Sequence, residues 1–168
     1  MEFSSKRQVA TPGVKQAVLA EVYDLGEVET PFGVKDRCRF IYEINECRTG
    51  TNVPLIVMAD YNKAWSKRSN LFKDVTSIVG RPLTSTEQLK FNAHSLIGVN
   101  CLITIVHRES KGVVYANIAN ISPIMPGMEL MEISEHYTPY AEVVRQREQR
   151  AAEIAAETNR GNSPYVIE

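Results

Sequence analysis

The chain is poor in cysteine. Its 168 residues include Cys38, Cys47 and Cys101, an odd number of cysteines at wide spacings, and no two of them form a C-x-x-C pair. Disulfide scaffolds need an even set of cysteines. Zinc sites need closely spaced cysteine and histidine ligands, and the three histidines are not at such spacings. We therefore expect reduced thiols and no metal site.

The chain also lacks a long apolar run. No segment approaches the roughly 18 consecutive apolar residues that a membrane-spanning helix requires. The first residues include Lys6 and Arg7, but no apolar stretch follows them, so they do not resemble a secretory signal. We expect a cytoplasmic protein with no membrane partner.

Sequence signatures of catalysis are missing as well. The chain contains no G-x-x-x-x-G-K-[ST] phosphate loop, no G-x-G-x-x-G, no H-E-x-x-H and no G-x-S-x-G. Such motifs place nucleophiles, metal ligands or phosphate-binding amides at fixed positions. We therefore predict that the protein is not an enzyme and uses no cofactor.

Charge is unevenly distributed along the chain. The 19 basic and 20 acidic residues give a net charge of −1. From Gly127 onward eight acidic residues outnumber four arginines, which leaves a net charge of +3 for residues 1–126. A mildly basic body with an acidic tail is compatible with a protein that binds nucleic acid.

The order of the expected elements is three strands, a helical segment and two strands. Alternating apolar residues and turn signals predict strands at 14–29, 34–45, 53–58, 100–107 and 113–123. Asn70 is the expected N-cap of a first helix, and Thr84 with Glu87 forms a capping-box pattern for a second helix that runs towards Leu96. Another helix is expected at residues 139–158.

This order is typical of the OB-fold. We therefore predict a mainly β protein: a five-stranded OB-fold Greek-key barrel with a helix between strands 3 and 4 and a C-terminal helix. Its expected organisation is a flexible N-terminal arm at residues 1–13, the barrel at 14–127, and a C-terminal helix and tail at 128–168.

The second expected strand has two different faces, because strand side chains alternate. One face carries the apolar residues Cys38, Phe40, Tyr42 and Ile44, and the other carries Lys35, Arg37 and Arg39. We interpret the apolar face, including both aromatic rings, as core. The basic stripe is either a solvated face or a contact for an anion. We favour the anion, because like charges at alternate positions repel one another.

OB barrels most often hold single-stranded nucleic acid, using cations for the phosphates and aromatic rings for the bases. The expected phosphate contacts are Lys35, Arg37, Arg39, Lys63, Lys67, Arg68, Arg108 and Lys111. The expected stacking residues are Phe32, Tyr61 and Trp65. Trp65 has core packing as an equal alternative. We expect Tyr115 to be core, since it lies among apolar strand residues.

One region of the chain resembles a group of bacteriophage and prophage proteins regarded as OB-fold single-stranded-DNA-binding proteins. The matching residues lie between Ala59 and Met128: Gly80-Arg81-Pro82-Leu83-Thr84, Phe91-Asn92, Leu96-Ile97-Gly98, Cys101-Leu102, His107, Glu109, Tyr115-Ala116-Asn117-Ile118 and Ile121-Ser122-Pro123. The resemblance implies that the protein coats transient single strands during phage DNA replication or recombination, in the cytoplasm of the host cell.

The resulting hypothesis is non-enzymatic binding of single-stranded DNA with low sequence specificity. A phage adaptor that binds a recombinase or a host factor is the alternative, and alternating Arg and Glu in the last helix would suit pairing with another helix. The terminal segment Ser163–Glu168 is either an unstructured end or a tip that docks in a partner's pocket. Preference for DNA over RNA, the replication or recombination partners, and homo-oligomer formation stay open.

Overall fold

The structure is a computed structural model that describes residues 8–161. The predictions for the first residues of the N-terminal arm and for the terminal segment Ser163–Glu168 lie outside this range. The chain divides into two compact units, Met1–Tyr137 and Thr138–Glu168. Each unit is described by itself.

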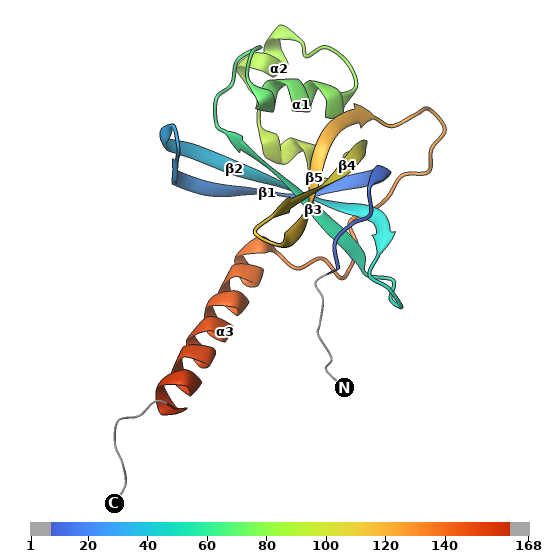
Figure 1. The fold of residues 1–168 in the computed structure, drawn as a ribbon. Coiled ribbons are helices and arrows are strands. Elements are labelled where there is room, and N and C mark those ends of the chain that lie inside the picture. Colours follow the sequence, from blue (N-terminus) through green and yellow to red (C-terminus); the bar gives the residue numbers. More distant parts are fainter. Residues whose placement is uncertain (1–7, 162–168) are drawn as a thin grey trace, which may run out of the picture. The chain divides into compact units, whose positions relative to one another are not determined.

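The first unit is built on a five-stranded antiparallel sheet (Figure 1). The strands are β1 (Gly13–Thr30), β2 (Gly33–Cys47), β3 (Pro54–Asn62), β4 (Asn100–Ser110) and β5 (Val113–Pro123), and their order across the sheet is β3-β2-β1-β4-β5. The edge strands β3 and β5 both line one cavity, so the sheet curls in a barrel-like way. The predictions of a mainly β fold and of a helical segment between the third and fourth strands are confirmed.

The inner face of the curled sheet forms the main core. Alternate residues of β2 point into it, and Phe40, Tyr42 and Ile44 are each completely buried. Leu19 from β1 and Ile103 from β4 meet them in the same cluster. The alternation expected for the second strand is therefore confirmed, with both of its aromatic rings in the core.

A bulge in β5 changes which side chains face outwards. Residues Thr104 and Ile105 of β4 pair with Asn120 and Ile118, so the intervening residue of β5 has no partner. A bulge of one residue reverses the faces of everything beyond it. Tyr115 consequently lies on the outer face and is 38% exposed, which makes the prediction that it belongs to the core wrong.

Two short helices and a 3₁₀ turn connect β3 to β4. Helix α1 (Asn70–Val79) packs against β3 and β5, and its N-cap is Ser69 rather than the predicted Asn70, because the Ser69 hydroxyl accepts the Phe72 N–H. The predicted second helix is broken into α2 (Ser85–Leu89) and the turn η1 (Ala93–Leu96).

Two local features fix the start of α2 and the end of α1. The capping box of Thr84 and Glu87 is present at the start of α2. Gly80 ends α1 in a left-handed conformation with φ of 80°, and a Cβ at this position would lie 2.9 Å from the Pro123 side chain. Glycine is therefore required there both by backbone conformation and by space.

Residues 124–137, which we call the strap, cross the outer face of the sheet. The Glu43 carboxylate accepts the Ser134 N–H and hydroxyl, each at 2.6 Å, although Glu43 is only 2% exposed. Asn100 exchanges two hydrogen bonds with the Met131 backbone, at 2.8 and 2.9 Å, and the Tyr137 hydroxyl donates to Glu21. These bonds hold the strap to the sheet, so the compact unit extends to Tyr137.

The second unit contains helix α3 (Tyr140–Gly161), where the sequence predicted a helix at 139–158. Its first turn contains Glu142, which pairs with Arg145. Within residues 8–161, no helix has the length and apolar character needed to cross a membrane.

Candidate functional site

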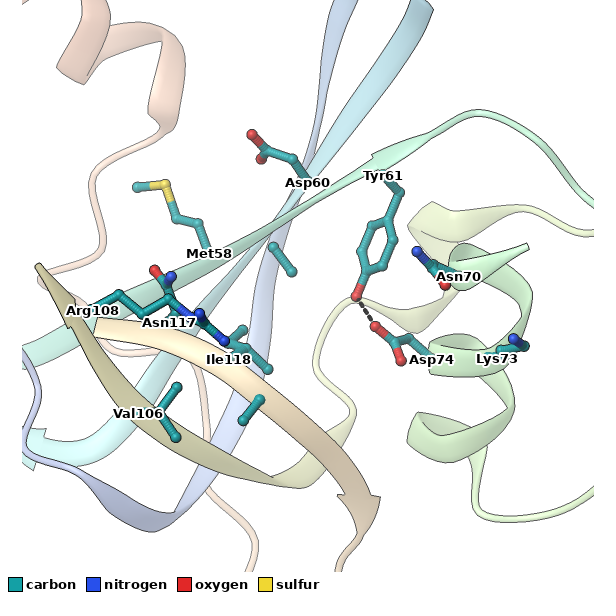
Figure 2. A pocket seen from close by; sticks show the side chains of 12 residues that line it. Met58, Asp60, Tyr61, Asn70, Lys73, Asp74, Val106, Arg108, Asn117 and Ile118 are labelled. Carbon is teal, nitrogen blue, oxygen red and sulfur yellow. Dashed lines mark hydrogen bonds between the residues drawn. The ribbon is translucent and has the colours of Figure 1, made fainter. Parts of the chain in front are cut away.

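A cavity lies between the two edge strands of the sheet and helix α1 (Figure 2). We call it the β3–β5 cavity, and its volume is about 450 Å³. Its lining comes from four elements: Met58, Ala59, Asp60 and Tyr61 of β3, Asn70, Lys73 and Asp74 of α1, Val106 and Arg108 of β4, and Asn117, Ile118 and Ala119 of β5. A cavity of this size at the edges of a curled sheet can admit a small organic group.

The basic stripe of β2 borders this cavity. Arg39 binds the Asp60 carboxylate through two parallel bonds, Nε to Oδ1 at 2.6 Å and Nη2 to Oδ2 at 2.8 Å. Because Asp60 also lines the cavity, Arg39 lies beside it. Lys35 and Arg37 occupy the same strand face as Arg39, since the three alternate along β2. The three basic residues of the predicted stripe therefore lie on one face of β2, and the stripe ends beside the cavity at Arg39.

The β4–β5 hairpin supplies cations and an aromatic ring on the other side of the cavity. Arg108 is opposite Tyr115 in the β4–β5 register, on the outer face. It lies within β4 rather than in the connecting loop where the sequence placed it. Lys111 forms the hairpin turn, in a left-handed conformation with φ of 51°. Among the described residues, neither of these cations has an ion-pair partner.

Lys63 does not join this group. Its ammonium lies 2.6 Å from Asp24 and 3.1 Å from Asp36, and Asp36 faces away from the basic stripe because it alternates with Lys35 and Arg37. The Lys63 hydrogen bond lowers the pKa of Asp24, and the Asp24 carboxylate raises the pKa of Lys63. The expectation that Lys63 continues the stripe is corrected, since its charge is paired and on the opposite face.

Tyr61 does not offer a free ring. Its side chain is 5% exposed, packs edge-to-face on Phe40 with ring centroids 5.1 Å apart, and donates a 2.5 Å hydrogen bond to Asp74. Burial, with the nearby Tyr42 and Asp74, raises the pKa of the Tyr61 hydroxyl. The prediction that Tyr61 stacks on a base is corrected, because the ring belongs to the core.

Trp65 is already stacked within the protein. Its ring lies parallel to Phe91 with centroids 4.0 Å apart and touches Phe72, and its indole N–H donates to the Gln88 carbonyl at 2.8 Å. These contacts join the segment after β3 to α1 and α2. Of the two roles considered for Trp65, packing is the one observed, and the predicted base-stacking role is corrected.

The remaining predicted residues are accessible to solvent. Phe32 is 87% exposed at the tip of the β1–β2 hairpin. Lys67 and Arg68 are exposed in the segment between β3 and α1 and have no ion pair with another described residue. Their positions agree with an interaction role, and whether they bind nucleic acid stays a prediction.

Five polar cavity residues were missed by the sequence reasoning: Asp60, Asp74, Asn70, Lys73 and Asn117. Within the described part of the chain, the side chains of the last three have no hydrogen-bond or ion-pair partner. Lys73 and Asn70 share one side of α1, as their spacing of three predicts, and this was the available signal. Asn117 could not be placed, because its face depends on the bulge in β5. Together with Arg108, these last three residues present donors and cations to a ligand.

The residues that the structure describes contain no cluster of three or more His, Cys, Asp or Glu side chains suited to a metal ion. No protein-family model matches the chain, and no curated protein matches it in sequence.

Proposed function

We propose that this protein binds single-stranded DNA with low sequence specificity, without acting as an enzyme, and serves phage DNA replication or recombination. The proposed scaffold is an OB-fold barrel. Its support is the strand order β3-β2-β1-β4-β5 with a helix between β3 and β4, which is the connectivity of a Greek-key barrel whose closure joins β3 to β5.

One observation carries the proposal: cations without an ion pair among the described residues, together with the Arg39–Asp60 ion pair, flank the β3–β5 cavity. Lys35, Arg37 and Arg39 approach it along β2, and Arg108 lies on its other side. A single DNA strand that runs from β2 across the cavity to the β4–β5 hairpin would follow what we call the nucleic-acid path. Its phosphates would meet cations at both ends of this path. Phe32 and Tyr115 are exposed rings on the two hairpins where bases could stack.

The ion pair of Arg39 with Asp60 does not remove Arg39 from this path. The Arg39 and Asp60 side chains are 23% and 30% exposed, so a phosphate can approach the guanidinium beside the carboxylate.

The proposal is tested by charge reversal on both sides of the cavity. The double variant Lys35→Glu with Arg108→Glu changes two exposed side chains that have no ion pair with any residue in the described range, so the fold should be retained. We expect its affinity for a fluorescent oligo-dT to fall more than about tenfold at low salt, because two phosphate contacts become repulsive.

A matched control makes the same change of charge elsewhere. Arg48, just after β2, and Lys90, at the end of α2, are exposed and do not line the cavity. The double variant Arg48→Glu with Lys90→Glu should bind within about threefold of the wild type, since only long-range repulsion is added. An equal loss of oligo-dT affinity in the two double variants would show that binding depends on net charge and not on the cations beside the cavity.

A protein-binding adaptor is the second candidate, favoured by apolar side chains on the strap. Met125 is 60% exposed and Leu130 is 63% exposed. Exposed apolar groups close together in the chain are typical of protein contacts. Replacing both with serine should leave oligo-dT binding unchanged under the first proposal, and should abolish capture of a recombinase or host factor under the second.

A further inference from the structure

The β3–β5 cavity contains polar groups that the protein itself does not use. Asn70, Asn117, Lys73 and Arg108 all line it, and none of these four side chains has a hydrogen-bond or ion-pair partner among the described residues. Figure 2 shows Arg108 and Asn117 on one side and Asn70 and Lys73 on the other. Polar groups that converge on a hollow without satisfying one another are typical of a ligand site.

Three apolar side chains lie in the lining among these groups, although most of the exposed lining is polar. Met58, Val106 and Ile118 are half-buried and line the cavity from β3, β4 and β5. Apolar side chains beside amides suit a flat ring that carries hydrogen-bonding groups on its edge. A side-chain amide offers both a donor and an acceptor, and the edge of every base contains both kinds of group.

Two carboxylates in the lining argue against a free anion as the ligand. Asp60 is engaged by Arg39, and Asp74 accepts the Tyr61 hydroxyl. An isolated phosphate inside the cavity would approach both carboxylates. A neutral ring would not be repelled, and the phosphates attached to it could stay at the rim with Arg108 and Lys73.

We propose that the β3–β5 cavity receives one nucleobase of the bound strand, turned out of the stack. Asn117 and Asn70 bind the edge of this base, and Arg108 and Lys73 bind the flanking phosphates. The inference rests on the proposed function and deepens it. The volume of about 450 Å³ lies in the range of known small-molecule sites, and turning a base out costs least in a single strand.

The test compares two oligomers that differ only in their bases. One is a mixed pyrimidine strand of about 20 nucleotides, longer than the roughly 4–16 nucleotides that one OB-fold covers. The other has the same sugar–phosphate backbone, with abasic positions throughout. Asn117→Ala should weaken binding of the first about fivefold to tenfold, through lost hydrogen bonds, and should leave binding of the abasic strand unchanged. Asn70→Ala should act in the same way.

Asn120→Ala is the matched control, because Asn120 is exposed on the same strand but does not line the cavity. It should bind both oligomers as the wild type does. The inference is overturned if Asn117→Ala weakens the binding of both oligomers equally, which would indicate a contact with the sugar–phosphate backbone. It is also overturned if the variant binds both oligomers as tightly as the wild type does. Wild-type protein that binds neither oligomer at low salt would instead overturn the proposed function, and the base site with it.

Discussion

At the scale of single residues, the partner of each cation decides what it can bind. Arg39 and Lys63 were expected to act alike, yet they lie on opposite faces of the sheet beside different carboxylates. A phosphate approaching Lys63 would also approach two carboxylates, Asp24 and Asp36. A phosphate approaching Arg39 would approach one carboxylate, Asp60, and the neighbouring cation Arg37. We therefore assign Arg39 to the nucleic-acid path and leave Lys63 out of it.

The two tyrosines of this region should separate stability from binding. Tyr61→Phe removes the hydroxyl that donates to Asp74 and should lower the free energy of unfolding by about 1–2 kcal/mol, with only a minor change in oligo-dT affinity, since Tyr61 makes none of the proposed contacts to the base or the phosphates. Tyr115→Ala removes an exposed ring and should weaken oligo-dT binding by about 1–3 kcal/mol, with little effect on unfolding. Urea titration and fluorescence anisotropy measure the two effects.

Unchanged binding in Tyr115→Ala would remove this ring from the proposed path. A large loss of binding in Tyr61→Phe, at unchanged stability, would contradict the assignment of Tyr61 to the core.

At the scale of elements, register explains most of the differences between sequence and structure. The face of β2 was predictable because apolar residues occupy every second position from Cys38 to Ile44, and basic residues every second position from Lys35 to Arg39. The face of Tyr115 was not, because the β5 bulge depends on pairing with β4 and leaves no local mark in the sequence. The capping box at Thr84 was predictable from four residues, while the packing of Trp65 against Phe91 required the path of the intervening chain.

The strap is an element that the sequence did not reveal, since residues 124–137 form neither a helix nor a strand. Its position depends on buried polar groups, above all the Glu43 carboxylate, whose two oxygens each accept one bond from Ser134. A buried carboxylate is stable only when such bonds are present. The strap therefore belongs to the fold, although it lacks regular secondary structure.

Ser134→Ala should accordingly destabilise the protein. It removes one of the two charge-assisted bonds to Glu43 and should lower the free energy of unfolding by about 1.5–3 kcal/mol. Urea unfolding measures this loss. Ser85→Ala, at an exposed position in α2, is the control and should stay within about 0.5 kcal/mol of the wild type. Equal stability of the two variants would mean that the strap contributes little to the fold.

At the scale of the whole molecule, the order of elements was predictable and the shape of the site was not. Length, turn signals and alternation indicated three strands, a helical segment and two strands, which is the observed order. The site needs contacts between residues far apart in the chain, such as Asp60, Asn70 and Asn117 around one cavity. No local pattern encodes these contacts, so the sequence identified the cations but not the cavity that they surround.

The net charge of −1 conceals a surface on which cations are locally in excess. In the described chain, seven basic residues on or near the proposed path have no ion pair: Lys35, Arg37, Lys67, Arg68, Lys73, Arg108 and Lys111. If about five of them meet phosphates, binding should release counterions from the strand and become strongly dependent on salt.

The most direct test is therefore the salt dependence of oligo-dT binding, measured by fluorescence anisotropy from about 50 to 200 mM NaCl. For about five phosphate contacts the logarithm of the association constant should fall with the logarithm of salt at a slope of about −3.5, a loss on the order of 100-fold. Lys35→Glu with Arg108→Glu should give a distinctly shallower slope. An affinity that does not change with salt, or an equal slope in this variant, would contradict the account.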